Sequence, residues 1–376
     1  MAKLGEVCDF YAGTGFPNEY QGRVTGKYPF YKVGDISKNV LEGNRELKTC
    51  ANYVEEDVVQ KLKGSILPPK TIVFAKIGEA LKLNRRAITS CECLVDNNVM
   101  GIKAQNVRLN DEYLFYWLQN LNLSDYSEST TVPSVKKSRL QNIEINVSPL
   151  EEQEKVVSTL NKLSSLILAR KKQLSKLDEL VKARFVEMFG ESEYPCNSLI
   201  SLIIEGAGLS YGIVQPGDDG TGDMGVLRPV DFADGKIKTD SIKYIDRSLG
   251  DGFKKTELNG NELLITVRGT TGITALTDSR FKGMNVTRGI AVIRYDKKKV
   301  DPIYLNEYIK MEKSQQYIKE HTRGATLQQI NLSELRDLEI VIPPLPLQRV
   351  FAAFVERVDQ QKQTVQQSLE KLELMK

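Results

Sequence analysis

Histidine is nearly absent from this chain, which has a single one, His321, among 376 residues. Cysteine is scarce too, with five scattered residues at positions 8, 50, 91, 93 and 196. A Ser-His-Asp or Cys-His catalytic group therefore has almost no material, and a zinc site, which needs about four nitrogen or sulfur ligands, is not expected. The odd, scattered set argues against a disulfide framework and fits a reducing compartment. We expect ordinary half-buried thiols.

Long apolar runs and a strong net charge are also missing. No stretch of about 18 uncharged apolar residues occurs, and the opening MAKLGEVCDF has no basic region followed by an apolar one. We therefore expect a soluble, cytoplasmic protein without a membrane partner. The 52 basic and 49 acidic residues leave a net charge of only +3, so any binding of a polyanion must depend on local patches.

Motifs for nucleotides and for methyl transfer are lacking as well. GTGDMG (Gly220 to Gly225) satisfies GxGxxG, but VQPGDD before it is no strand and VLRPVDF after it is no helix, so a surface loop is the better interpretation. GTTGITA has no Walker A lysine. LPPKT and IPPL lack the polar residue before the prolines and the aromatic residue after them with which amino-methyltransferases hold a flipped base. The sequence predicts a non-catalytic chain with no cofactor and no metal.

What the chain does contain is a duplicated unit. IEINVSPLEEQEKVV (143–157) returns as LEIVIPPLPLQRVFA (338–352), 195 positions later. The same offset pairs identical residues around the phrase: Thr131/Thr326, Ser138/Ser333, Leu140/Leu335, Leu174/Leu369 and Leu177/Leu372. Weaker echoes need small shifts, FYKVGDI against VLRPVDF at offset 196 and IVFAKIG against LLITVRG at 191. Short β-branched runs mixed with helix indicate two duplicated α+β domains.

Two long helices are predicted after the repeated phrase. Pro149 and Pro344 suit a helix entry, and neither glycine nor proline interrupts the first segment before Gly190, so that helix should run from about 150 to 188. Apolar positions four and three apart indicate an antiparallel coiled coil between the helices, with two independent surface helices as the alternative. The predicted seam is Val156, Leu160, Leu163, Ile167, Leu174, Leu177 and Val181, with Phe351, Val355, Val358, Val365, Leu369 and Leu372.

Basic residues gather at predicted turns and strand ends, interleaved with Thr, Ser and Gly. Arginine and lysine can contact guanine edges or phosphates, and hydroxyls can donate to phosphate oxygens, although any one of them is more often a solvated charge. The candidate DNA-binding residues are Lys32, Lys76, Arg85, Arg86, Lys136, Lys137, Arg228, Arg268, Thr270, Arg288 and Arg323.

Over essentially its whole length the chain resembles the specificity (S) subunit of Type I restriction-modification enzymes. The resemblance is carried by SPLEEQEKVV and PPLPLQRVF at the two repeat exits, LDELVKARFVEMFG (177–190) and KLGEVCDFYAGTGFP (3–17). It implies target-recognition domains at 1–148 and 191–343, each reading one half of a bipartite double-stranded DNA target. Coiled-coil helices at 149–190 and 344–376 would space these domains about a pseudo-two-fold axis.

The resemblance also implies partners that carry the chemistry. Two methyltransferase (M) subunits would dock on the helices, bind S-adenosylmethionine and methylate adenine, and restriction (R) subunits using ATP and Mg are optional partners. PLQ (346–348) replaces EEQ (151–153), and LEKLELMK ends the sequence without an RFVEMFG-like segment, so equivalence of the two docking surfaces is not assured. Two alternatives stay open: the recognition subunit of a related Type II (IIB or IIG-like) system, and a coiled-coil interaction protein that does not read DNA.

Overall fold

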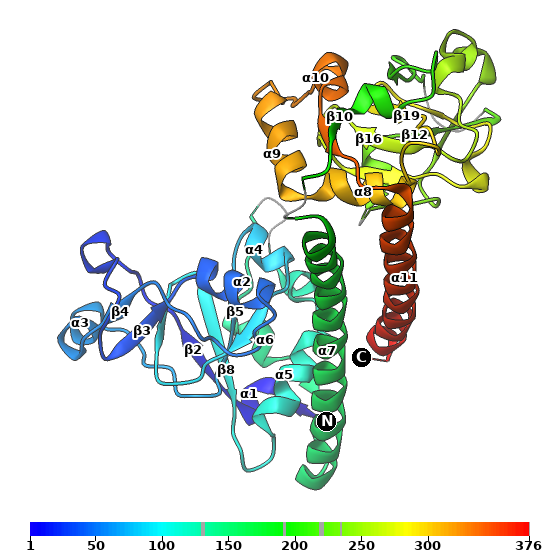
Figure 1. Ribbon diagram of the computed structural model, residues 1–376. Coiled ribbons are helices and arrows are strands. Elements are labelled where there is room, and N and C mark those ends of the chain that lie inside the picture. Colours follow the sequence, from blue (N-terminus) through cyan, green and yellow to red (C-terminus); the bar gives the residue numbers. More distant parts are fainter. Residues whose placement is uncertain (129–131, 191–192, 218–221, 234, 376) are drawn as a thin grey trace. The chain divides into compact units, whose positions relative to one another are not determined.

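The structure, a computed structural model, describes residues 1–128, 132–190, 193–217, 222–233 and 235–375. The chain forms two compact units (Figure 1), unit 1 made of Met1–Lys171 with Leu369–Lys376 and unit 2 of Lys172–Ser368. Thr131 of the repeat alignment, and Gly220 and Thr221 of the GTGDMG string, lie outside the described residues.

Unit 1 alternates short strands and helices before a long helix begins. Its strands are β1 (Ala2–Lys3), β2 (Cys8–Ala12), β3 (Tyr28–Tyr31), β4 (Tyr53–Val54), β5 (Ile72–Ala75), β6 (Arg86–Ile88), β7 (Leu94–Val95), β8 (Val99–Ala104) and β9 (Glu144–Ile145). Its helices are α1 (Leu4–Val7), η1 (Asn18–Tyr20), α2 (Val33–Leu41), α3 (Glu56–Leu62), α4 (Glu79–Lys82), α5 (Asp111–Gln119), η2 (Leu123–Tyr126), α6 (Lys137–Gln141) and the start of α7 (Leu150–Phe189).

The body of unit 1 is built on two sheets. One is a four-stranded antiparallel sheet in the order β2-β8-β5-β6, and the other has the order β4-β3-β7, with β7 parallel to β3. The central strand β5 is buried at every position, because Ile72 and Phe74 enter one apolar cluster and Val73 enters another. A third pairing, β1 with β9, places the first residues beside the strand that precedes α7.

Unit 2 repeats this order of elements after the end of α7. Its strands are β10 (Cys196–Ser198), β11 (Ser210–Tyr211), β12 (Met224–Leu227), β13 (Phe232–Ala233), β14 (Lys236–Ile237), β15 (Lys243–Ile245), β16 (Leu263–Thr266), β17 (Thr274–Leu276), β18 (Asn285–Val286), β19 (Ile290–Ile293) and β20 (Glu339–Val341). Its helices are η3 (Leu199–Leu202), η4 (Pro229–Asp231), η5 (Arg247–Thr256), η6 (Ser279–Phe281), α8 (Pro302–Lys310), α9 (Glu312–His321), α10 (Leu332–Arg336) and α11 (Leu345–Leu374).

Three sheets of unit 2 reproduce those of unit 1, with the orders β11-β19-β16-β17, β15-β12-β18 and β10-β20. Unit 2 adds a two-stranded sheet, β13-β14. The register is kept as well: Ile72 stands opposite Ile102 in unit 1, and Leu263 opposite Ile293, each 191 positions later, in unit 2. The duplicated α+β fold predicted from the sequence is confirmed.

The two long helices have the predicted lengths. Helix α7 runs over Leu150–Phe189, against the expected 150 to 188. Within unit 2 it is antiparallel to α11, because Phe185 lies 5.4 Å from Phe351 between ring centroids while Asp178, further back on α7, pairs with Lys362 at 2.6 Å. In unit 1, Lys171 pairs with Glu373 at 2.8 Å. The boundaries of the units cut both helices, so the division into four segments stays a prediction.

The predicted seam needs one correction at its start. Val156 is 44% exposed, whereas its neighbour Val157 is 8% exposed, so the prediction for Val156 was wrong. The buried stripe of the first turns is set by Gln153, which is fully buried, and four-three spacing from there leads to Val157 and Leu160. The other seam residues are buried or half-buried: Leu160, Leu163, Ile167, Leu174, Leu177, Val181, Phe351, Val355, Val358, Val365, Leu369 and Leu372.

The end of α7 carries an aromatic cluster that the heptad pattern does not predict. Phe185 and Phe189 are buried, and both pack on Tyr304 of α8 and Phe351 of α11, with ring centroids 5.1 to 5.7 Å apart. The last turns of α7 are therefore part of the core of unit 2.

We predict that Phe351→Ala destabilises unit 2 by about 3–5 kcal/mol, because Phe351 is fully buried and its removal leaves a cavity among the rings of the cluster. Val350→Ala is the matched control, since Val350 is 53% exposed and should change stability by less than about 0.5 kcal/mol. Chemical denaturation followed by limited proteolysis measures both, and equal stabilities would contradict the assignment of Phe351 to the core.

Candidate nucleic-acid interface

A braced loop follows the central strand of unit 1. The N–H of Lys76 donates to the carbonyl of Asn98 at 2.9 Å, and its carbonyl accepts from Val135 N–H at 2.9 Å. The N–H of Gly78 donates to the carbonyl of Pro133 at 2.8 Å. Gly78 has a φ of +73°, a conformation that glycine adopts without strain. These bonds bring residues 76–79, 96–98 and 133–137 together, and we call these three segments the loop cluster of unit 1.

Unit 2 has the same loop cluster, made of residues 267–272, 287–289 and 323–330. The N–H of Val267 donates to Gly289 at 2.8 Å, and its carbonyl accepts from Ile330 at 3.0 Å. The N–H of Gly269 donates to the carbonyl of Gln328 at 2.8 Å, and Gly269 has a φ of +86°. Each bond has its counterpart in unit 1, so the backbone frame of the two clusters is the same.

The loop clusters gather seven of the eleven predicted DNA-binding residues. In unit 1, Lys76 is half-buried, while Lys136 and Lys137 are exposed. In unit 2, Arg268 is half-buried, and the others are exposed. The residues brought together are Lys76, Lys136 and Lys137 in unit 1, and Arg268, Thr270, Arg288 and Arg323 in unit 2.

Two further candidates lie near or outside these clusters. Arg85 directly precedes β6, whose first residue Arg86 stands opposite Phe74, so Arg85 lies at the end of the sheet from which the loop at Lys76 leaves. Lys32 lies elsewhere, at the start of α2. Its Nζ donates to Gln21 Oε1 at 2.5 Å and lies 5.5 Å from the ring centroid of Phe16.

Two arginines on the predicted list make hydrogen bonds within their own units. Arg86 is only 5% exposed, and its guanidinium donates to the carbonyls of Asn84 (3.2 Å) and Leu121 and to Asn84 Oδ1 (2.9 Å). Burial lowers the pKa of Arg86 to about 10. Arg228 holds the fully buried carboxylate of Asp231 through Nη2 (3.0 Å) and Nε (3.2 Å). The guanidinium of Arg86 is therefore taken up inside unit 1, whereas Arg228 is half-buried and its role in DNA binding stays a prediction.

An ion pair with reversed charges braces each cluster. In unit 1, Glu128 Oε1 lies 3.7 Å from Arg139 Nε, and in unit 2 Arg323 Nη2 lies 3.3 Å from Glu334 Oε1. Both partners are related by the offset of 195, with acid and base exchanged. Glu128 also pairs with Lys136 at 2.6 Å. Arg323 thus has an internal partner although its side chain is 76% exposed, and its role in DNA binding stays a prediction. The sequence already shows this exchange, because Glu334 stands 195 positions after Arg139. Arg139 was nevertheless not among the predicted residues.

A buried glutamine joins each domain to its long helix. Gln153 Oε1 accepts from Asn110 N–H at 2.8 Å, and its Nε2 donates to the carbonyls of Arg108 (2.9 Å) and Ser148 (2.7 Å). In unit 2, Gln348 Oε1 accepts from Asp301 N–H at 2.8 Å, and its Nε2 donates to Pro343 at 2.7 Å.

Both glutamines are fully buried, and Asn110 and Asp301 are the N-caps of α5 and α8. This explains why glutamine is kept in the repeated phrase although its neighbours differ.

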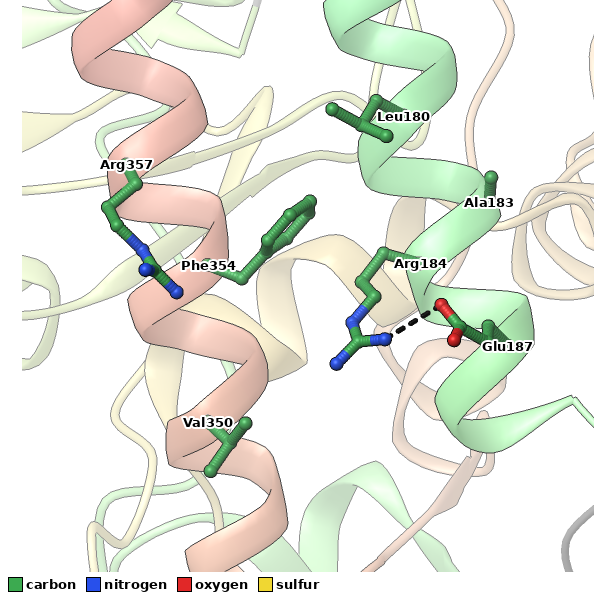
Figure 2. Close-up of a pocket in the computed structure, with 7 residues that line it drawn as sticks. All are labelled: Leu180, Ala183, Arg184, Glu187, Val350, Phe354 and Arg357. Carbon is green, nitrogen blue, oxygen red and sulfur yellow. Dashed lines mark hydrogen bonds and ion pairs between the residues drawn. The ribbon is translucent and has the colours of Figure 1, made fainter.

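The helix pair of unit 2 carries an apolar groove. It is lined by Leu180 and Ala183 of α7 and by Val350 and Phe354 of α11 (Figure 2). Its charged members are Arg184, Glu187 and Arg357, and Arg184 Nη1 donates to Glu187 Oε2 at 2.8 Å.

The corresponding turns of α7 in unit 1 are chemically different. There Lys155 and Thr159 stand where α11 has Val350 and Phe354, and Lys155 pairs with Glu151 at 2.8 Å. The two repeat exits therefore present unlike surfaces.

The structure also places the cysteines and the GTGDMG string. Cys8 and Cys93 are buried, Cys50 is half-buried, and Cys91 and Cys196 are exposed. Burial raises the pKa of Cys8 to about 12, so that thiol is protonated at neutral pH.

Met224 and Gly225 of GTGDMG begin strand β12, which leads into the short η4. Within the described residues, no group of three or more His, Cys, Asp or Glu side chains could hold a metal, and no helix could span a membrane.

Comparison with known proteins connects this architecture to one family. A family model described as Type I restriction modification DNA specificity domain matches residues 1–179 and 221–374. The chain is 20% identical to the Type I restriction enzyme EcoBI specificity subunit of Escherichia coli, over 94% of this chain and 78% of that protein. It is 23% identical to the putative MjaX specificity subunit of Methanocaldococcus jannaschii, over 88% and 80%.

Solved structures show the same fold. The S subunit of a Type I restriction-modification system from M. genitalium aligns with a TM-score of 0.55 at 13% identity, covering 99% of this chain and 92% of that one. A chain from a structure that concerns complex assembly and conformational transition of the type I R-M system aligns with a TM-score of 0.58 at 17% identity, covering 100% and 94%.

We predict that Gln153→Ala lowers the stability of unit 1 by about 1–3 kcal/mol, because Asn110 N–H and two carbonyls lose their buried partner. Glu152→Ala is the control, since Glu152 is exposed in the same helical turn. Hydrogen exchange of the α5 N-terminus reports the joint directly. Protection that is unchanged in Gln153→Ala would refute its role.

Proposed function

The chain belongs to the family of Type I restriction modification DNA specificity domains, and on that premise we propose that it is the sequence-reading subunit of a DNA adenine methylation complex. It carries out no chemistry itself. Each unit reads one half of a bipartite double-stranded target, and separate subunits modify the DNA.

The observation that carries this proposal is the pair of loop clusters. Their backbone frames match bond for bond, yet their side chains differ. A scaffold that is constant while its surface varies suits the reading of two different half-sites. Basic residues and hydroxyls near phosphates position such a domain, and residues that reach base edges give it specificity.

The helices serve as spacer and docking surface in this proposal. Helix α7 has 40 residues and hence a length of about 60 Å, which is more than a domain of this size needs for its own core. Two methyltransferase subunits dock on the helices, and the apolar groove of unit 2 and the polar exit of unit 1 offer them unlike contacts.

Cofactors are assigned to the partners. The methyltransferase subunits hold S-adenosylmethionine, and a restriction subunit, where one joins, uses ATP and Mg. Cytoplasmic location stays a prediction.

The test of this function is long-read methylation sequencing of cells that have no other adenine methyltransferase and that express the chain with its methyltransferase partner. We expect one bipartite adenine motif, absent when the chain is omitted. A methylome that is the same with and without the chain would refute the proposal.

A second prediction tests the spacer. Removing residues 172–178 from α7 together with the facing residues 362–368 of α11 shortens the helix pair by about 10 Å and keeps its rotational phase within about 20°. Because about 10 Å corresponds to roughly three base pairs, methylation at the parental spacing should be lost, and any residual motif should have a shorter spacer.

The control for the spacer replaces rather than removes residues 172–178, keeping Leu174 and Leu177 and changing the others to alanine. It should retain the parental spacer, because the length of the helix is unchanged. A deletion variant that assembles and methylates the parental motif would contradict the spacer role.

A further inference from the structure

One position in each loop cluster combines a fixed backbone with a variable side chain. It is the second residue after the central strand, Ile77 after β5 and Arg268 after β16. Each forms an antiparallel bridge with the neighbouring segment, Ile77 with Ser134 and Arg268 with Gln329. The two pairs occupy the same place in the repeat, so Ile77 and Arg268 are structural equivalents.

The backbone on both sides of this position is held by equal bonds. The residue before it accepts and donates one backbone hydrogen bond each, and the glycine after it donates one more, at 2.8 to 3.0 Å in both units. Because these backbone hydrogen bonds hold both flanking residues, the side chain between them is presented at a defined place. The reading of a base edge requires such a fixed position.

The surroundings leave room for a ligand at this position. Within the described parts of the chain, a Cβ placed on Gly78 or Gly269 would meet no atom within 4 Å. Ile77 and Arg268 are both half-buried, so their stems are supported while part of each side chain stays accessible. The guanidinium of Arg268 has no hydrogen-bond or ion-pair partner in the structure's described residues.

Positive charge stands beside the position in both units. Lys76 directly precedes Ile77, and Arg288 lies on the segment that binds Val267, the residue before Arg268. Neither Lys76 nor Arg288 has a side-chain partner among the described residues. These cations suit phosphates, and the neighbouring positions of Ile77 and Arg268 are then available for base edges.

We propose that Ile77 and Arg268 are the specificity-determining residues at equivalent places of the two half-sites, Arg268 reading the guanine of a G·C pair and Ile77 the methyl group of a thymine. Arginine can donate two hydrogen bonds to O6 and N7 of guanine in the major groove. Isoleucine has no donor, and its apolar surface fits the thymine C5-methyl. The inference rests on the proposed function, since it names the base that each unit selects.

The experiment exchanges the two side chains. The full chain carrying Arg268→Ile or Ile77→Arg is expressed with its methyltransferase partner, and the methylome is sequenced. Arg268→Ile should change one position of one half-site, lowering the preference for its G·C pair by about 5- to 100-fold. Ile77→Arg should introduce a G·C preference at one position of the other half-site.

Two further variants serve as controls. Arg268→Lys should keep the G·C pair with weaker selection, because lysine can also donate to guanine. Arg280→Ile removes an exposed arginine of unit 2 that is bound to Asp278, and it should leave the motif unchanged. Co-purification with the methyltransferase subunit shows that each variant is folded.

The outcomes separate this inference from the function on which it rests. A wild-type chain that directs no bipartite motif overturns the function itself. A wild-type motif with no G·C pair in one half or no A·T pair in the other overturns the inference alone, whatever the variants do. So does an assembled Arg268→Ile variant whose motif is unchanged, or a change in both halves from a single substitution.

Discussion

The buried amide of a glutamine is the interaction on which the arrangement of each unit depends. Gln153 and Gln348 each lie at the start of a long helix and bind the backbone at the N-cap of a helix of the preceding domain, α5 or α8. A primary amide can accept and donate at once, so one side chain satisfies groups on both elements. The angle at which a long helix leaves its domain is thereby fixed by hydrogen bonds that no water can replace.

Around this shared joint the two units are stabilised differently. In unit 1, Asn161 of α7 binds Glu112 of α5 at 2.7 Å and also accepts from Tyr116 and Arg45, so polar groups hold the helix. In unit 2, the rings of Phe185, Phe189, Tyr304 and Phe351 do so. The hydrogen bonds of unit 1 weaken when one of the bonded residues is substituted. The aromatic packing of unit 2 depends instead on the shape and the buried area of the rings. The two repeats therefore share the hydrogen bonds of the exit but not the chemistry that surrounds it.

Sequence reasoning succeeded where the determinants are local. The strand, proline and heptad signals at residues 143–188 predicted helix α7 to within one residue of its end, since each signal acts over a few positions. It failed where the role of a residue depends on a partner that is distant in the sequence. Nothing near Arg86 in the sequence reveals the carbonyl of Leu121, and nothing in the heptad pattern reveals that α8 buries Phe185. The proposed role of Ile77 was not predicted, because basic charge marked the candidate DNA-binding residues and Ile77 is apolar.

The charge-reversed brace has a consequence for how such chains can exchange parts. Because Glu128 pairs with Arg139 where Arg323 pairs with Glu334, moving one partner alone between the repeats would place like charges together. A substitution at one of these positions keeps the attraction only when the charge at the other position changes sign as well. Because Arg139 and Arg323 are 53% and 76% exposed, a mismatch should cost about 1 kcal/mol or less. The ion pair thus couples the charges of two positions that lie eleven residues apart in each repeat.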